Sequence, residues 1–366
     1  MAAVGEVIAV DSTAAVQDAV LTTRRLLARG GGTKSALSAP LPETTVLDLR
    51  GLSGMLEYEP GEFVFTALAG TPLQTLATAL AAHGQYLPFD PPWVEQGATL
   101  GGTIAAGLSG SGRQRYGGLR DFLIGARYVD GQGRLIRSGG KVVKNAAGFD
   151  QHKLLIGSLG RLGVLVEVSF KVFPQPQSYS TLRIDAGTMG AAVDLLGRLA
   201  LGKFDTEALD IVFDEDDAPA VLVRLGGWST VLPQRIASLR AWLGRGTPLA
   251  ADEDLALWRQ ARALAWLPAG TAVVKIPLTL TEVAPLEDAL AGTGAHRRYA
   301  AGGNLAWIGW PGDLADLEAR LHMLGLAGLV LVGQTTKPLI GVRTGENLAA
   351  RIKRTLDPNN KFPELA

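Results

Sequence analysis

The segment Arg29-Gly30-Gly31-Gly32-Thr33-Lys34-Ser35 has the residue types of a loop that binds phosphate groups. Its glycines lie between a cationic residue on each side, so successive backbone N–H groups can form a nest around an anion, and a diphosphate would suit it. The alternative is a flexible surface turn. The segment is not a Walker A loop, because it lacks the upstream glycine at the right spacing and a glycine directly before Lys34. A nucleoside triphosphatase is therefore disfavoured.

A second glycine-rich segment, residues 97–112, carries small residues at almost every position. No ordinary strand or helix requires that pattern. Small side chains would let the main chain approach a flat ring and a diphosphate and form hydrogen bonds with them. Arg113, Tyr116 and Gly118 would then close the far side. The alternative is a glycine-rich hairpin packed against a helix.

A third segment combines residues 141–150 with the run Gly157-Ser158-Leu159-Gly160-Arg161-Leu162-Gly163-Val164. Its Gly-x-x-Gly-x-x-Gly spacing differs from the Gly-x-Gly-x-x-Gly of a Rossmann fold, and it does not obviously open a helix. A nicotinamide dinucleotide is thus a less favoured ligand than another nucleotide cofactor.

The elements around these segments mix strands and helices without a strict repeat. Alternating and apolar patterns predict strands at residues 7–10, 46–49, 63–68 and 164–172. A helix is expected at 72–83, with Pro72 in its first turn. Another helical pattern begins after Ser12 or Thr13 and is formed by Ala15, Val16, Ala19, Val20, Leu26 and Leu27.

The length of 366 residues exceeds the limit of about 250 to 300 residues for one hydrophobic core, so more than one domain is expected. Two prolines among polar residues at 173–178 mark a boundary. Beyond it, strands at 221–225, 273–277 and 305–309 alternate with helices at 189–201, 232–243 and 313–324. We therefore expect domains at 1–175 and 176–335, the second of α+β type, and a C-terminal segment at 336–366 with a helix at 344–356.

The composition excludes several classes of protein. With 47% hydrophobic and 19% charged residues, and 46 glycines without a Gly-X-Y period, it is typical of a turn-rich globular protein. Lys plus Arg and Asp plus Glu both total 35, so there is no uniform basic charge for binding a nucleic acid. The absence of cysteine excludes disulfides, thiol catalysis and an iron–sulfur cluster held by this chain alone.

The sequence also bears on location. Residues 1–16 carry Glu6 and Asp11 and lack a basic stretch followed by an unbroken apolar run, so they do not have the pattern of a signal peptide. The longest apolar run, residues 324–332, is too short to span a bilayer. These patterns predict a cytoplasmic protein, with peripheral attachment to the inner face of the plasma membrane through partners as a further option.

Taken together, the three glycine-rich segments resemble the FAD-linked oxidases of the vanillyl-alcohol oxidase type, also called PCMH-type, in order and spacing. The likeness is strong over residues 29–174 and faint beyond. Within that family, the run from Lys144 to Gly160 is most similar to the E subunits of bacterial glycolate oxidase.

The resemblance implies an α+β fold in which FAD lies between the two lobes of a PCMH-type domain, residues 1–175. The diphosphate would lie on the first loop and the isoalloxazine ring would face a smaller, reduced α+β cap at 176–335. The C-terminal helix, within 336–366, would return to the flavin domain. Residue by residue, the resemblance points to these FAD contacts: Arg29, Gly30, Gly31, Gly32, Thr33, Lys34, Ser35, Gly97, Ala98, Thr99, Gly101, Gly102, Ala105, Ser109, Arg113, Gly118, Gly160, Gly163 and Val164.

Departures from the family pattern limit what is carried over. Some relatives attach flavin through a histidine in the phosphate loop, but Gly30–Ser35 has none, so the FAD is expected to be non-covalent. D-2-hydroxyacid oxidising relatives carry a Gly-Asp-Gly-Asn-Leu-His signature in the cap. This chain has Gly302 and Ala306 in place of its acid and histidine. The sequence therefore identifies no catalytic residue and no metal ligand. The family's terminal Asn-Pro-Gly motif is also altered in this chain, within residues 360–364.

The remaining polar candidates have ordinary structural interpretations. We expect His296 to lie in a solvated loop and His322 on a helix surface, and the tryptophans, Trp307 and Trp310 included, to belong to the core. Lys337 and Arg343 could bind a substrate carboxylate, although nothing in the sequence singles them out.

The resemblance suggests an FAD-binding subunit of a glycolate (2-hydroxyacid) oxidase or dehydrogenase complex. Its partners would be a catalytic flavoprotein subunit and a cysteine-rich iron–sulfur subunit. The sequence does not decide whether this chain itself catalyses the oxidation. A second hypothesis is a self-sufficient FAD-dependent D-2-hydroxyacid dehydrogenase, which needs a proton acceptor. A third is a structural subunit of the same complex that has lost flavin.

Overall fold

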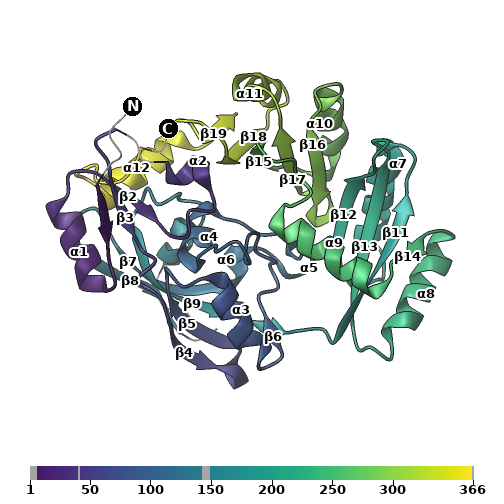
Figure 1. Cartoon of the computed structure of the whole chain (residues 1–366), viewed down its shortest axis with the longest axis horizontal. Coiled ribbons are helices and arrows are strands. Elements are labelled where there is room, and N and C mark those ends of the chain that lie inside the picture. Colours follow the sequence, from purple (N-terminus) through teal and green to yellow (C-terminus); the bar gives the residue numbers. More distant parts are fainter. Residues whose placement is uncertain (1–5, 40–41, 142–148, 365–366) are drawn as a thin grey trace. The chain divides into compact units, whose positions relative to one another are not determined.

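The computed structural model describes residues 6–39, 42–141 and 149–364. Its chain divides into two compact units, each with its own fold (Figure 1). Unit 1 comprises residues 1–109, 118–175 and 344–366, and unit 2 comprises residues 110–117 and 176–343. In the part of the chain that the structure describes, no helix has both the length and the apolar character needed to cross a membrane.

Unit 1 contains a parallel sheet, a larger antiparallel sheet and a short antiparallel pair. In spatial order, the parallel sheet has β1 (Val7–Ala9), β3 (Thr45–Asp48) and β2 (Leu26–Arg29). The antiparallel sheet has β4 (Met55–Glu59), β5 (Val64–Leu68), β9 (Val164–Lys171), β7 (Leu123–Val129) and β8 (Leu135–Gly139). The pair is β10 (Phe173–Pro174) with β6 (Gln85–Tyr86).

Short helices connect these strands. They are α1 (Thr13–Thr22), α2 (Ser35–Ser38), α3 (Leu73–Ala81), α4 (Leu100–Ala106), α6 (Leu119–Phe122) and α12 (Glu346–Leu356), with 3-10 turns η1 (Pro60–Glu62) and η2 (Gln151–Leu155). The predicted strands at 7–10, 46–49, 63–68 and 164–172 are confirmed as β1, β3, β5 and β9, and the helix at 72–83 as α3, with Pro72 as its N-cap.

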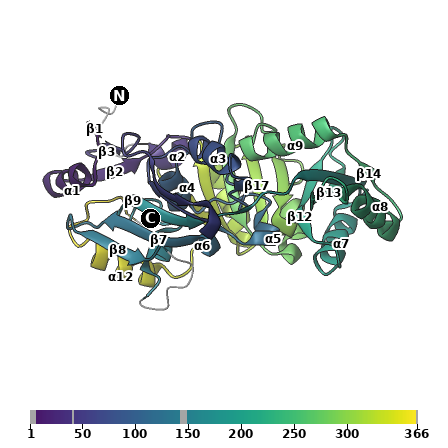
Figure 2. The same cartoon turned by 90° about the horizontal axis from the view of Figure 1, so that it is seen from below.

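One core joins the two sheets of unit 1. Val16 and Val20 of α1, which flanks the parallel sheet in Figures 1 and 2, pack with Leu47 of β3 and with Val166 of β9. Phe362, near the C-terminus, is buried in the same cluster. Because each sheet buries one face in this core, the loops that follow β2 and precede β9 are held on fixed strands.

The prediction that Leu26 and Leu27 continue the first helix is wrong. The helix α1 ends at Thr22, and both leucines lie in β2, paired in parallel with β3. The residues are consecutive and both buried, which a parallel strand covered on both faces requires. Their helical spacing from Ala19 and Val20 is coincidental.

The sequence patterns assigned no helix within residues 97–112, but α4 occupies Leu100–Ala106. Thr99 caps its N-terminus by accepting a hydrogen bond from the backbone N–H of Gly102 at 3.3 Å. Leu100 and Ile104, one turn apart, are fully buried. Gly107, with φ 61°, ends the helix in the left-handed conformation that favours glycine.

Unit 2 is built on one antiparallel sheet. In spatial order, its described strands are β14 (Thr247–Pro248), β11 (Ser178–Asp185), β13 (Pro219–Gly227), β12 (Thr206–Phe213), β16 (His296–Ala300), β17 (Leu305–Trp310), β15 (Ala272–Pro277), β18 (Ala327–Val332) and β19 (Leu339–Gly341). The helices are α5 (Arg113–Tyr116), α7 (Met189–Ala200), α8 (Leu232–Leu243), α9 (Ala251–Ala263), α10 (Val283–Leu290) and α11 (Leu314–Met323), with 3-10 turns η3 (Leu280–Glu282) and η4 (Ala301–Gly303).

The predicted elements of this region are confirmed in β13, β15, β17, α7, α8 and α11, and the predicted tail helix in α12. Trp307 and Trp310 are buried as expected, whereas Trp228 is 67% exposed. His322 is exposed on α11 as expected. His296 is also exposed, but it lies in β16 rather than in a loop.

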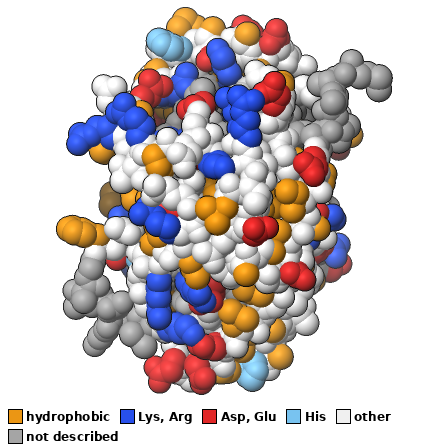
Figure 3. All heavy atoms as spheres, turned by 90° about the vertical axis from the view of Figure 1, so that its left-hand side faces the viewer, with side chains coloured by type: hydrophobic (Ala, Val, Ile, Leu, Met, Phe, Trp, Pro, Cys, Tyr) orange, Lys and Arg blue, Asp and Glu red, His pale blue; other side chains and the backbone are white. Residues whose placement is uncertain are grey.

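Charges are mixed on the surface. Figure 3 shows one face of the molecule, on which Lys and Arg side chains alternate with Asp and Glu, with hydrophobic side chains between them. This face of the described residues carries no large patch of one sign, in agreement with the balanced composition.

Candidate nucleotide-binding site

The phosphate-type loop follows the C-terminal end of β2 and leads into α2. Its first two glycines are required by packing within the protein. A Cβ on Gly30 would lie 2.1 Å from Thr99 Oγ1, and a Cβ on Gly31 would lie 1.9 Å from the carbonyl oxygen of Gly97. Gly32 has φ 69° and open space around the place of its Cβ, so it needs glycine for its backbone conformation. The loop is thus fastened to the second glycine-rich segment.

The helix α4 supplies the second wall. Gly101 packs against the strand end that follows β5, since a Cβ there would lie 2.9 Å from the carbonyl oxygen of Ala69. Gly102 and Ala105, one turn apart, are only partly buried and line a cavity. These two positions therefore present backbone and small side chains to whatever occupies the cavity.

The turn before β9 closes the site. Its backbone bonds to the C-terminal end of α4, because the N–H of Leu159 donates to the carbonyl oxygen of Ala105 at 2.8 Å and that of Gly157 to Ile104 at 3.0 Å. Leu159 and Gly160 both have left-handed φ, 55° and 73°. The turn leads into a strand, as expected from its spacing, and not into a helix.

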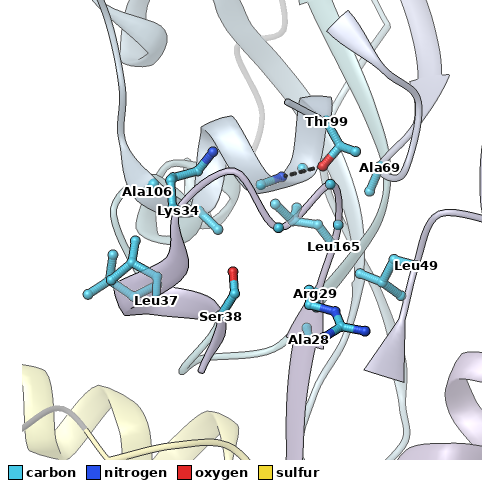
Figure 4. Close-up of a pocket in the computed structure, with 18 of the residues that line it drawn as sticks. Ala28, Arg29, Lys34, Leu37, Ser38, Leu49, Ala69, Thr99, Ala106 and Leu165 are labelled. Atoms are coloured by element: carbon cyan, nitrogen blue, oxygen red, sulfur yellow. Dashed lines mark hydrogen bonds between the residues drawn. The ribbon is translucent and has the colours of Figure 1, made fainter. Parts of the chain in front are cut away.

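The three segments surround one cavity of about 750 Å³, part of which is open to solvent. In Figure 4, Lys34, Leu37 and Ser38 lie on one side, and Arg29, Leu49 and Thr99 on the other. The predicted residues that line it are Arg29, Gly30, Gly31, Gly32, Thr33, Lys34, Thr99, Gly101, Gly102, Ala105, Gly160 and Gly163.

The other predicted contacts lie outside the lining. Ser35 begins α2, Gly97 and Ala98 lie behind the phosphate loop, and Val164 is fully buried in the core. Ser109 accepts a hydrogen bond from the backbone N–H of Leu119 at 3.4 Å, and Gly118 is the N-cap of α6. Arg113 belongs to unit 2. Of the predicted segment 141–150, residues 142–148 lie outside the described part of the chain.

Sequence reasoning missed several lining residues: Ala28, Leu37, Ser38, Leu49, Ala69, Ala106, Ser158, Leu159 and Leu165. Most of them adjoin a glycine-rich segment, and that neighbourhood was the available signal. Leu49 and Ala69 follow β3 and β5, and only the fold brings them to the cavity. The leucines give the cavity an apolar part, which suits a flat ring.

Charge in the cavity has one sign. Its lining contains the cations Arg29 and Lys34 and, among the described residues, no aspartate or glutamate. Lys34 is 6% exposed, and burial lowers its pKa to about 8. Backbone N–H groups at the glycines and these two cations make the cavity suited to an anionic ligand.

The altered cap motif forms a tight turn in unit 2. Ala301, Gly302 and Gly303, all with left-handed φ, make up η4, and Asn304 Nδ2 donates to the carbonyl oxygen of Ala301 at 2.9 Å. Ala306 is buried in β17. A Cβ on Gly302 would lie 2.5 Å from Gln114 Oε1, so the turn has no room for the family's aspartate unless Gln114 moves.

A buried carboxylate anchors this turn. Asp210 of β12 is fully buried, its Oδ2 accepts hydrogen bonds from Ser111 Oγ at 2.6 Å and Arg298 Nε at 2.8 Å, and its Oδ1 accepts from the N–H of Ala301 at 3.3 Å. These contacts occupy the carboxylate, which therefore acts as a structural group here. Among the described residues, no three His, Cys, Asp or Glu side chains gather as a metal site would require.

Comparison with known protein families matches residues 6–139 to the FAD binding domain. The chain is 44% identical to glycolate oxidase subunit GlcE of Escherichia coli (strain K12), over 46% of this chain and 48% of that protein. It is 34% identical to a D-lactate dehydrogenase of Archaeoglobus fulgidus, over 47% and 38% of the two chains. It is 29% identical to glycolate oxidase subunit GlcD of Bacillus subtilis (strain 168), over 54% and 41%. The matched part thus spans about half or less of these relatives.

Among solved structures, an alkyldihydroxyacetonephosphate synthase has a similar fold, with a TM-score of 0.70 over 97% of this chain and 74% of that one, at 16% identity. The mixed helix and strand fold is therefore one found in PCMH-type proteins. The resemblance to FAD-linked oxidases predicted from the sequence is confirmed. Residues 6–139, which include the phosphate loop and α4 at the cavity, are thus the part of the chain that is similar to the FAD binding domain.

Proposed function

We propose that this chain is the non-covalent FAD-binding subunit of a complex that oxidises 2-hydroxyacids such as glycolate. The proposal rests on the cavity of unit 1. Its walls are the three glycine-rich segments, and its two charged side chains are both cations. In this proposal, a catalytic flavoprotein subunit removes electrons from the substrate, and an iron–sulfur subunit receives them.

The residues at the cavity suit the two chemical parts of FAD. Glycine backbone and the cations Arg29 and Lys34 would hold the diphosphate, while Leu37 and Leu165 would contact apolar ring surface. FAD, when bound, supplies a carrier for hydride and for single electrons. The loop residues 30–35 include no histidine and the chain has no cysteine, which supports non-covalent attachment.

The residues of the cap turn support the proposal that this chain's flavin relays electrons and does not itself oxidise the substrate. The positions of the signature's acid and histidine are held by Gly302 and Ala306, and Asn304 bonds within its own turn. Removing a hydride from a 2-hydroxyacid needs a group that takes the hydroxyl proton. The turn provides no such side chain.

The relatives support a multi-subunit assembly. Two of them carry the name of a glycolate oxidase subunit, GlcE and GlcD. The absence of cysteine in this chain fits a division of labour in which another subunit holds the iron–sulfur cluster. In this proposal the complex is cytoplasmic and reaches the inner face of the plasma membrane through the partner subunits.

One observation favours a second candidate, a self-sufficient D-2-hydroxyacid dehydrogenase. Lys275 of β15 is partly buried in unit 2, and burial, with the nearby positive charge of Arg113, lowers its pKa to about 8. A lysine with a pKa near the working pH is suited to accept a proton. Sequence reasoning did not name Lys275, because nothing in the pattern of β15 marks it.

Anaerobic titration with glycolate separates the two candidates. We expect the flavin of the isolated, FAD-loaded chain to stay oxidised, as followed by visible absorbance, and to become reduced when the catalytic flavoprotein partner is added. D-lactate is tested in parallel. Bleaching of the isolated chain, abolished by Lys275→Met, would instead support the dehydrogenase and contradict the relay role.

A further inference from the structure

Lys34 is a buried cation whose surroundings provide little compensation for its charge. Its Nζ donates a hydrogen bond to Thr33 Oγ1 at 2.9 Å and lies 5.5 Å from the ring centre of Trp93. Among the hydrogen bonds and ion pairs of the described residues, none joins Lys34 to a carboxylate. A buried charge without an opposite charge is costly, so such a group often marks a binding site.

Trp93 has a backbone conformation that a bulky residue rarely adopts. It has φ 62° and is 7% exposed. Its carbonyl oxygen accepts a hydrogen bond from the N–H of Ala98 at 3.0 Å, which ties it to the segment that precedes α4. Backbone strain of this kind persists where the surrounding structure enforces it, often at ligand sites. The indole face gives the ammonium a partial, uncharged counterpart.

Among the described residues, no side chain of the cavity lining carries a negative charge. Arg29 lines the cavity at the end of β2, and the lining residues of α4 and of the turn before β9 are all uncharged. The described cavity thus combines two cations with glycine backbone, and an anion brought by the ligand would be the first negative charge in it.

We propose that the Lys34 ammonium, held by Thr33 and Trp93, is the fixed counter-charge for the diphosphate of the bound dinucleotide, and that it makes the site select diphosphate over monophosphate flavins. This inference rests on the proposed function, because it takes FAD as the ligand. Riboflavin, which has no phosphate, would gain nothing from Lys34.

A linked proton follows from the same arrangement. Burial lowers the pKa of Lys34 to about 8 in the ligand-free protein, so above that pH the amine is largely neutral. A diphosphate beside it favours the charged form and raises its pKa. Binding FAD at about pH 9 therefore takes up a proton from solvent onto Nζ, and FAD affinity falls as the pH rises through about 8.

The test compares the full chain with Lys34→Met and Lys34→Arg by calorimetric titration with FAD, FMN and riboflavin. Lys34→Met is expected to weaken FAD about tenfold or more, to weaken FMN less, and to leave riboflavin unchanged. Lys34→Arg should restore FAD binding without proton uptake, because arginine stays charged. Lys171→Met is the matched control, since that lysine also lies over an aromatic ring, Phe122 at 5.9 Å, but is not part of the lining.

Proton uptake is measured by repeating the FAD titration at about pH 9 in buffers with different ionisation enthalpies. Buffer-dependent heats in the wild type that vanish in Lys34→Met and Lys34→Arg would support the inference. FAD binding that is equal in the wild type and Lys34→Met, or that lacks proton uptake in the wild type, would overturn it. A wild-type chain that binds no flavin would instead refute the proposed function.

Discussion

Gly102→Trp is expected to give a folded protein without bound FAD. Gly102 lines the cavity from α4, and a Cβ there would meet only Thr99 Oγ1, at 3.0 Å. The indole would then project into the space that FAD needs, while replacing glycine inside a helix costs no propensity. Flavin content after incubation with FAD and desalting checks the result, with far-ultraviolet circular dichroism as the measure of folding.

Two further variants make this test specific. Gly61→Trp, in η1, is the control, since nothing lies within 4 Å of the place of its Cβ, and it should keep full flavin. Gly101→Ala should destabilise unit 1, because its methyl group would meet the backbone of Ala69. If Gly102→Trp keeps as much flavin as Gly61→Trp, the cavity is not the FAD site.

Asp357→Ala is expected to lower the stability of unit 1 by about 3 to 5 kcal/mol. Asp357 and Lys353 form a buried ion pair, and Asp357 also accepts hydrogen bonds from the N–H groups of Lys361 at 2.8 Å and Phe362 at 2.9 Å. Removing the carboxylate leaves the Lys353 ammonium buried without its partner and frees the turn that carries Phe362 into the core. Thermal unfolding should shift by roughly 10 °C.

The matched control is Asp150→Ala, which removes an exposed carboxylate paired with Lys153 in the same unit. Exposed pairs contribute little to stability, because solvent and salt screen them, so this variant should unfold close to the wild type. Adding Lys353→Met to Asp357→Ala should recover part of the loss, because no unpaired charge is then buried. Equal stability of Asp357→Ala and Asp150→Ala would show that the tail does not hold unit 1 together.

Most elements with a regular apolar pattern could be predicted from the sequence. Periodic apolar residues placed β5, β9, α3, α7 and α8 close to their observed bounds. Leu26 and Leu27 were misassigned because two adjacent buried leucines fit a helix face as well as a strand that is covered on both sides. In α4, the abundance of glycine obscured a helix whose caps, Thr99 and Gly107, were readable.

The site was predictable where its chemistry depends on the backbone. Glycines at 30, 31 and 101 mark close approach, and in the structure the place of each missing Cβ lies against another part of the protein. Leu49 and Ala69 could not be predicted from the sequence, since they come from strand ends that only the fold brings together. The pair of Lys34 and Trp93 was also missed, because the contact depends on the unusual backbone of Trp93.

The central claim, that unit 1 binds FAD without a covalent bond, is tested most directly by flavin stoichiometry. The purified chain is incubated with FAD, desalted and precipitated with acid, and the flavin in the supernatant is identified and quantified. We expect about one FAD per chain, all of it released by the acid, as one cofactor cavity implies. A chain that remains free of flavin, or that keeps flavin in the precipitate, would contradict the account.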